Sequence, residues 1–357
     1  MRKEILISYF PKITYKRYQT LIRQFENLDS AWNAEFSDFA AKTWEPDIIH
    51  EFLAWRETVN VAEIESTLQK ENINTVFFTD PDYPPLLREI HDPPLCLFVR
   101  GNIKDVSYPI AVVGTRKCSP YGRQVVEEII PDLVLCKMTI VSGLALGIDG
   151  ISHEATLKHA GRTIAILGSG IDTNTIYPGE HRHLAEKIIA SGGAVISEYP
   201  PYTKGSPYSF PRRNRIIAGM SLGTVVIEAQ ESSGSLITAQ CALEYNRDVF
   251  AVPQNINSAT AAGPNNLIKM GARVVTQSQD ILDIFLLQKP IAEKKEIVGE
   301  NAEETLLLKT LSREPTHIDT VIKNTGISAA SIMSTLTILE IKGKVRNLGS
   351  QNYILIL

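Results

Sequence analysis

The sequence lacks the features that mark several classes of protein. Its 357 residues include only four cysteines, Cys96, Cys118, Cys136 and Cys241, and no C-x-x-C pair. This pattern indicates neither a zinc site nor a disulfide framework, and it fits a reducing cytosol. The first residues, MRKEILISYF, lack the long apolar region of a signal peptide. No uncharged apolar run approaches the ~18–20 residues that span a bilayer, so we expect a cytoplasmic protein without membrane contact.

An excess of positive charge is also lacking. The formal net charge is −4, with 36 Lys and Arg against 40 Asp and Glu. A chain that bound nucleic acid over its whole surface would usually be basic, so any anion-binding site must be local. The length exceeds the roughly 250–300 residues at which a single core stops growing. Two or three domains are therefore expected.

The texture of the sequence changes along the chain and indicates three domains. Residues 1–74 have apolar residues at helical spacing and contain all three tryptophans, Trp32, Trp44 and Trp55, which we expect in a core. Residues 75–286 predict an α/β domain. Residues 287–302 have the polarity of a linker. Residues 303–357 predict helices followed by a β-hairpin, the order of a winged helix.

The α/β prediction depends on a repeated pattern in which apolar, β-branched runs end in Gly/Ser loops that open helices. These runs are IAVVGTR, TIVSGLALG, TIAILGSG, AVISEY, TVVIEAQESSG, VFAVPQ and ARVVTQ. Runs that are apolar on both faces are typical of strands buried from both sides. The sequence therefore predicts a Rossmann-like, doubly wound parallel sheet.

The loops after these strands carry candidate anion-binding groups. In an open α/β sheet, ligands bind outside the carboxyl ends of the strands. One loop offers Gly114, Arg116 and the helix cap Ser119, followed by Pro120. Other groups expected at this edge are Gly143, the helix start Ser233-Gly234-Ser235, and Arg213 and Arg215 of FPRRNRIIAG. Helix N-termini with arginines beside them predict a pocket for a phosphate-bearing ligand.

The usual catalytic motifs are missing. The sequence has no G-x-G-x-x-G, no G-x-x-x-x-G-K-[ST] and no G-x-S-x-G. Asp149 and His153 have the spacing of an acid–base pair, but a carboxylate at a helix start and a hydrogen-bonded histidine explain them as well. His181 and His183 do not have a usual zinc spacing. No catalytic centre, cofactor or metal site is predicted.

Several segments together resemble the DNA-processing protein A family of bacteria, called DprA or Smf. They are SGLALGIDGISHEATL, GSGIDTNTIYPGEHRHL, ISEYPP, FPRRNRIIAGMS and VVIEAQESSGSLITAQCALEYNRDVFAVP. The resemblance implies a non-enzymatic homodimer that binds single-stranded DNA during natural transformation, protects it and loads the RecA recombinase. It also implies that single-strand-binding protein, a possible partner, is displaced or tolerated. The single-strand pocket implied by the family's motifs comprises Gly114, Arg116, Ser119, Arg213, Asn214, Arg215, Ser233, Gly234 and Ser235.

The arginine cluster fits this interpretation if it is extended. Arg213 and Arg215 then alternate with Asn214 and point to one face, where their guanidinium groups match a phosphate backbone and stack on bases. Asn214 points away and holds the loop through a backbone hydrogen bond. Arg212 lies on the other face and is solvated.

The flanking domains differ from typical DNA binders. The segment FPKITYKRY lacks the hairpin glycine of a helix–hairpin–helix module, so a structural or partner-binding role is expected for residues 1–72. The presumed recognition helix, SAASIMSTLTILEIKG, has no Lys or Arg before Lys342. Contact with a protein or with the central domain is therefore expected for the winged helix.

The alternative function is enzymatic. The loops are also similar to those of nucleoside-monophosphate phosphoribohydrolases, which carry P-G-G-x-G-T-x-x-E. If Gly234-Ser235 occupies the G-T position, the glutamate should fall near Thr238, where there is no carboxylate. Phosphate binding would then remain without hydrolysis.

Overall fold

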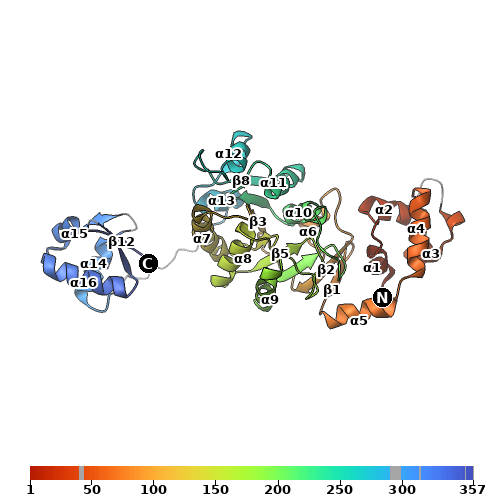
Figure 1. Ribbon diagram of the computed structural model, residues 1–357, viewed down its shortest axis with the longest axis horizontal. Helices are drawn as coiled ribbons and strands as arrows, with labels where there is room; N and C mark the ends of the chain where they lie inside the picture. Colours follow the sequence, from red (N-terminus) through yellow and green to blue (C-terminus); the bar gives the residue numbers. More distant parts are fainter. Residues whose placement is uncertain (40–43, 290–298, 313–314, 350, 357) are drawn as a thin grey trace. The chain divides into compact units, whose positions relative to one another are not determined.

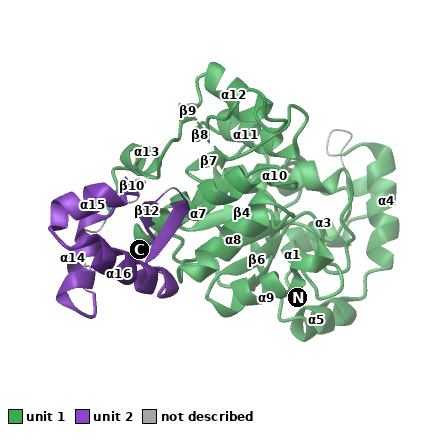
Figure 2. Cartoon of the chain, turned by 60° about the vertical axis from the view of Figure 1, so that its left-hand side comes forward, with its two compact units in different colours: residues 1–289 green, residues 290–357 purple. Residues whose placement is uncertain are grey.

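The computed structural model describes residues 1–39, 44–289, 299–312, 315–349 and 351–356. The chain divides into two compact units, residues 1–289 (unit 1) and 290–357 (unit 2), coloured separately in Figure 2. The predicted boundary at residue 74 lies inside unit 1, and most of the predicted linker lies outside the described residues. No helix in the described part of the chain is both long and apolar enough to cross a membrane.

Unit 1 begins with short helices around a core rich in aromatic side chains. These elements are α1 (Lys3–Ser8), α2 (Tyr15–Gln24), α3 (Leu28–Asn33), η1 (Phe36–Asp38), α4 (Pro46–Glu57) and α5 (Val61–Lys70). Trp44 is buried beside Phe52, and Trp32 and Trp55 are partly buried in the same cluster. The tryptophans therefore belong to a core, as the sequence predicts. This part also reaches the sheet: Tyr9, which directly follows α1, meets Phe98 edge to face, and Tyr18 of α2 meets Phe77.

A nine-stranded sheet forms the body of unit 1 (Figure 1). Its strands are β1 (Asn74–Phe77), β2 (Cys96–Gly101), β3 (Ile110–Val113), β4 (Ile140–Ser142), β5 (Thr163–Leu167), β6 (Ala194–Ser197), β7 (Gly223–Val226), β8 (Asp248–Ala251) and β9 (Arg273–Val274). The order is β1-β2-β6-β5-β4-β3-β7-β8-β9. The seven strands from β3 to β9 pair in parallel, whereas β1 and β2 are antiparallel. The predicted doubly wound sheet is confirmed.

Helices cover both faces of this sheet, because successive side chains of a strand point to opposite faces and both sets are buried. Ala111 and Val113 pack on one face, while Ile110 and Val112 pack on the other. The first face is covered by α6 (Pro85–Arg88), α10 (Ser209–Gly219), α11 (Gly234–Glu244) and α12 (Ala262–Lys269). The second is covered by α7 (Pro120–Leu135), α8 (Ile148–Lys158), α9 (Arg182–Ala190), α13 (Gln279–Leu282) and η3 (Asp283–Phe285), and the short η2 (Gly179–His181) directly precedes α9. The parallel strands therefore deliver their following loops to one edge.

Unit 2 is a winged helix with its own core. Its elements are α14 (Ala302–Thr310), β10 (Thr316–His317), α15 (Ile318–Thr325), α16 (Ala329–Ile341), β11 (Val345–Gly349) and β12 (Asn352–Leu355). The three strands pair in the order β10-β12-β11. Leu307, Val321 and Leu336 from the three helices are fully buried together. The winged-helix prediction is confirmed.

Candidate nucleic-acid interface

The carboxyl ends of β3, β4 and β7 open onto a pocket of about 490 Å³, which we call the strand-edge pocket. Helix α10 forms one wall through Phe210, Arg213, Asn214 and Ile217. These positions have the i, i+3, i+4, i+7 spacing of one helix face. The first turns of α8 and α11 contribute Asp149 and the pair Gly234 and Ser235. Two helix N-termini, which favour anions, therefore meet at one edge.

Arg213 is a buried cation whose hydrogen bonds to the described residues all go to neutral groups. The residue is 5% exposed. Its Nη1 donates to the carbonyl of Gly143 at 2.7 Å and to that of Ile166, and its Nε donates to Asn214 Oδ1 at 3.1 Å. Burial lowers the pKa of Arg213 to about 10, although the nearby Asp149 raises it. The guanidinium therefore stays charged at neutral pH without a carboxylate hydrogen bond.

Gly143 is required by the close approach of these groups. A Cβ at this position would lie 2.7 Å from both Arg213 Cζ and Asp149 Oδ2. The amide of Gly143 also donates to Asp149 Oδ2 at 3.1 Å. Burial raises the pKa of Asp149, and the charge of Arg213 opposes that shift. Gly143 lines a small annex of the strand-edge pocket, together with Arg116, Arg213 and Tyr177.

Arg116 is the exposed cation of the pocket. Its guanidinium carbon lies 5.8 Å from the centre of the Phe210 ring, and that ring lies 5.3 Å from the ring of Tyr177. Gly114 permits the turn that carries Arg116, because a Cβ there would lie 2.6 Å from Ile148 Cγ1. The pocket therefore combines an unburied guanidinium with two aromatic rings, a combination suited to phosphates and bases.

Asn214 connects two elements of the pocket. Its Nδ2 donates to the carbonyl of Gly234 at 2.9 Å, which ties α10 to the first turn of α11. Ser233 caps α11, with its side chain accepting from Ser235 N. The prediction that Asn214 points away from Arg213 is wrong, since both line the pocket, and its backbone hydrogen bond holds the turn at residues 233–235 rather than its own segment.

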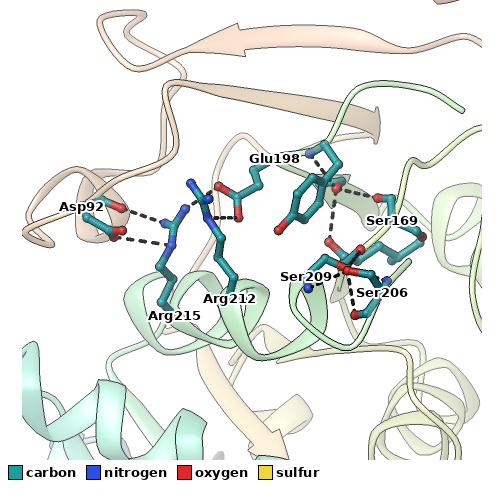
Figure 3. Close-up of polar contacts among 11 residues, drawn as sticks. Asp92, Ser169, Glu198, Ser206, Ser209, Arg212 and Arg215 are labelled. Atoms are coloured by element: carbon teal, nitrogen blue, oxygen red, sulfur yellow. Dashed lines mark hydrogen bonds and ion pairs between the residues drawn. The ribbon is translucent and has the colours of Figure 1, made fainter. Parts of the chain in front are cut away.

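The predicted extended conformation of FPRRNRIIAG is wrong, because the segment forms helix α10. Residues two apart on a helix point about 200° apart, so Arg213 and Arg215 lie on different sides. Arg215 donates to the Asp92 carbonyl at 2.8 Å and to the Glu198 carboxylate (Figure 3). Arg212, 47% exposed, brings its Nε to 3.5 Å from the same carboxylate. Arg215 therefore does not line the strand-edge pocket and is neutralised.

Ser119 also lies outside the pocket lining. It caps α7 as predicted, with its side chain accepting from Gly122 N. Its own N and Oγ donate to the buried carboxylate of Glu228, at 2.9 and 2.5 Å. The hydroxyl is therefore committed to holding the loop that carries Arg116. Of the ten predicted residues, those that line the pocket or its annex are Gly114, Arg116, Gly143, Arg213, Asn214, Ser233, Gly234 and Ser235.

Sequence reasoning missed the aromatic residues and the anchoring acid. Phe210 stands in the segment already selected for its arginines, and Tyr177 stands in the TIYPG motif. Glu228, which is fully buried, directly follows an apolar strand run. A carboxylate at the end of a buried strand is the signal that could have revealed it.

The groups weighed as catalytic have structural partners. His153 Nδ1 lies 2.6 Å from Thr163 Oγ1, and His181 Nδ1 lies 2.8 Å from the Leu144 carbonyl. Within the described ranges, Asp149 and His153 share no hydrogen bond, and no group of three or more residues could hold a metal ion. Thr238 is buried in the pocket wall and brings no carboxylate to it.

Comparisons with known proteins agree with this architecture. The family model described as DNA recombination-mediator protein A matches residues 74–286, and the model described as DprA winged helix domain matches residues 292–350. Protein Smf of Escherichia coli is 39% identical over 292 residues, covering 78% of each chain. DNA processing protein DprA of Bacillus subtilis is 43% identical over 217 residues, covering 60% of this chain and 72% of the relative.

Solved structures give the same result. The X-ray structure of DprA from Streptococcus pneumoniae superposes with a TM-score of 0.67 at 35% identity, covering 79% of this chain and 98% of that one. DprA from Helicobacter pylori, described for its unique single-stranded DNA binding mode, gives a TM-score of 0.53 at 29% identity, covering 60% and 95%. The resemblance predicted from the motifs is confirmed. The DNA recombination-mediator protein A model alone matches more than half of the 357 residues. The chain therefore belongs to the DNA recombination-mediator protein A family, which includes DprA and Smf.

Proposed function

We propose that the strand-edge pocket binds the sugar–phosphate backbone and bases of single-stranded DNA. The observation that carries the proposal is the pairing of exposed Arg116 with buried Arg213, whose hydrogen bonds in the described part of the chain go to neutral groups. The N-termini of α8 and α11 add to the positive potential at the same place. A phosphate here would meet charge and backbone donors without breaking an ion pair, because Asp149, which also lines the pocket, makes no hydrogen bond to Arg213 within the described residues.

The size and the rings of the pocket favour a single strand over a duplex. A pocket of about 490 Å³ has the volume of a small-ligand site and accommodates an unpaired nucleotide. Phe210 and Tyr177 offer ring faces on which any base can stack, so binding should tolerate any sequence. A base inside a duplex presents only its edges in the grooves.

The remaining parts of the proposed role follow from family membership. We infer that the bound strand is protected and delivered to RecA, in a homodimer, in the cytoplasm, and with single-strand-binding protein as a competing partner. No hydrolytic role is proposed, since Thr238 stands where a related phosphoribohydrolase would need its glutamate. The named solved relative from Helicobacter pylori, described for single-stranded DNA binding, supports the ligand.

The test is fluorescence anisotropy of a labelled oligothymidylate titrated with the full chain, with duplex as competitor. Single-strand preference and a log–log salt slope of about 0.7 per phosphate contact are expected. Arg116→Glu should lower the affinity at least about a hundredfold, since it replaces attraction by repulsion at a phosphate. Lys158→Glu is the matched control, because this exposed lysine ends α8, towards the opposite edge of the sheet. Equal affinities for the two variants would overturn the proposal.

A further inference from the structure

A second cavity, larger than the strand-edge pocket, lies on the other side of α10. It measures about 920 Å³ and is lined by residues of the N-terminal helices, of the segment 91–96 and of the segment 198–215; we call it the α2–α10 cavity. Glu198 and Tyr199, which directly follow β6, help to line it. Since β6 runs parallel to β5 and its neighbours, this cavity opens at the same edge of the sheet as the strand-edge pocket.

Helix α10 is the shared wall of the two cavities. Phe210, Arg213 and Asn214 line the strand-edge pocket, whereas Arg212 and Arg215 line the α2–α10 cavity. A helix with its side chains is about 10–12 Å across. A strand bound in one cavity therefore has to extend by several more nucleotides to pass over the beginning of α10 and reach the other.

The charge of the α2–α10 cavity suits a phosphate near its mouth. Arg215 is held by Asp92 and Glu198, so its own positive charge is already compensated (Figure 3). Arg212 shares Glu198 and stays 47% exposed, and Lys16 of α2 is exposed. Three Lys and Arg residues and two carboxylates line the cavity, so one positive charge is left in excess. The available cations are thus at the surface of the cavity.

Aromatic side chains line the α2–α10 cavity, and further tyrosines are exposed near the start of α10. Tyr9, Tyr15 and Tyr199 are among its lining residues. Tyr208, at the start of α10, is 88% exposed, and Tyr202 is 49% exposed. Tyr208 lies in sequence between Pro207, which lines the strand-edge pocket, and Arg212, which lines the second cavity. Exposed rings next to cations are the elements of a sequence-tolerant single-strand track.

We propose that the α2–α10 cavity is a second nucleotide site for the same strand, completed by α2 of the N-terminal helices. The inference rests on the proposed function of the strand-edge pocket and extends it to a longer footprint. A strand held at Arg116 and Arg213 crosses Tyr208 and places a further phosphate at Lys16 and Arg212. The N-terminal helices then have a direct role in DNA binding rather than a purely structural one.

The test compares two oligothymidylates, one of about four and one of about twenty nucleotides, which bracket the usual single-strand site sizes. In the full chain, Lys16→Glu and Arg212→Gln should each lower the affinity for the long strand about tenfold and reduce its salt slope by about 0.7. Affinity for the short strand should stay within about twofold, because the strand-edge pocket is unchanged. Tyr208→Ala, at an exposed position that leaves the core intact, should lower only long-strand affinity. Lys158→Glu serves again as the control.

The two proposals fail in distinguishable ways. If Arg116→Glu leaves binding of both oligonucleotides unchanged, the strand-edge pocket itself is not the binding site. If Arg116→Glu abolishes binding but Lys16→Glu, Arg212→Gln and Tyr208→Ala leave the long strand at wild-type affinity, only the second site is refuted. Equal losses for short and long strands in the Lys16 variant would also refute it, because a second site cannot affect a strand too short to reach it.

Discussion

The two compact units of the chain use their cations differently. At the sheet edge of unit 1, Arg213 bonds to neutral groups and Arg116 is exposed over a ring. In unit 2, Lys342 at the end of α16 is paired with Glu300 and Glu304, both at 2.8 Å. The partners of a cation, more than the fold that carries it, therefore decide whether it is available to DNA.

The exposed face of α16 continues this contrast. The hydroxyls of Ser331 and Thr335 both donate to Glu303 Oε1, at 2.6 and 3.0 Å. Met333 and Ile341 are 50% and 82% exposed. A helix that reads a major groove normally offers basic or amide groups to bases and phosphates. This helix offers apolar side chains and hydroxyls already bonded to a carboxylate, so the expectation of a protein contact stays the better prediction for it.

The largest expected effect is at Arg215, a cation of unit 1 that is already paired with Asp92 and Glu198. Arg215→Ala should lower the free energy of unfolding by about 3–5 kcal/mol, because it leaves Glu198 buried without its main partner. Both side chains are 9% exposed. Urea unfolding measures this loss. Short-strand binding by the folded fraction should remain, since Arg215 does not line the strand-edge pocket.

Arg212→Ala is the matched control on the same helix. Its side chain is 47% exposed and shares the same carboxylate, so the loss should stay below about 1 kcal/mol. A small loss for Arg215→Ala, together with weakened short-strand binding, would mean that Arg215 serves the DNA, as the sequence first suggested.

Much of the sheet edge is visible in the sequence because burial leaves a pattern. The four residues of β3 are all buried, which explains the uninterrupted apolar run before Gly114. The caps Ser119 and Ser233 follow from local backbone chemistry, which acts over three or four residues. Helix starts and the loops after strands could therefore be located, and with them most of the pocket lining.

Helix α10 was misjudged because its faces are not separated into apolar and polar. Phe210, Arg213, Asn214 and Ile217 share one face, so a charged residue interrupts the helical period of apolar residues. The partners of Arg215 lie at Glu198 and Asp92, 17 and 123 residues away. No local pattern encodes those pairings, since they arise only when the loop at residue 92 and the end of β6 meet in the folded sheet.

The second-largest expected effect is a difference in single-strand affinity between a variant of unit 2 and a variant of unit 1. Without this difference, the contrast between the two units would not hold. Lys344→Glu combined with Arg346→Glu reverses two charges on the wing of unit 2, where Arg346 is exposed on β11. Single-strand affinity should stay within about twofold, against the hundredfold loss of Arg116→Glu, a difference of over 2 kcal/mol. Anisotropy at low salt, where electrostatic contacts are strongest, is the measurement. A tenfold loss in the wing variant would show that unit 2 also contacts the strand.

The smallest expected effect is a loss of folding stability in acid. It should distinguish the two units, because His153 belongs to unit 1. His153 is fully buried, and its Nε2 has no hydrogen-bond partner in the described part of the chain. Burial, followed by the charges of His181 and Arg213, lowers the pKa of His153 from 6.5 to about 3. The neutral form is therefore favoured in the folded state, and the stability that it contributes is fully present only above pH 6.5.

Between pH 6.5 and 3 the unfolded chain holds a proton that the folded chain excludes, so stability should fall by about 1.4 kcal/mol per pH unit from this group. Tryptophan fluorescence reports unit 1 alone, since all three tryptophans lie before residue 56. Urea unfolding at pH 7 and pH 5.5 should show the loss, and His153→Gln should remove this part of the slope even if it lowers stability overall. In unit 2, Lys342 holds the pKa of Glu304 below 4.5, so its contribution is lost only at more acidic pH. An unchanged slope in the His153 variant would mean that another group of unit 1 takes up the proton.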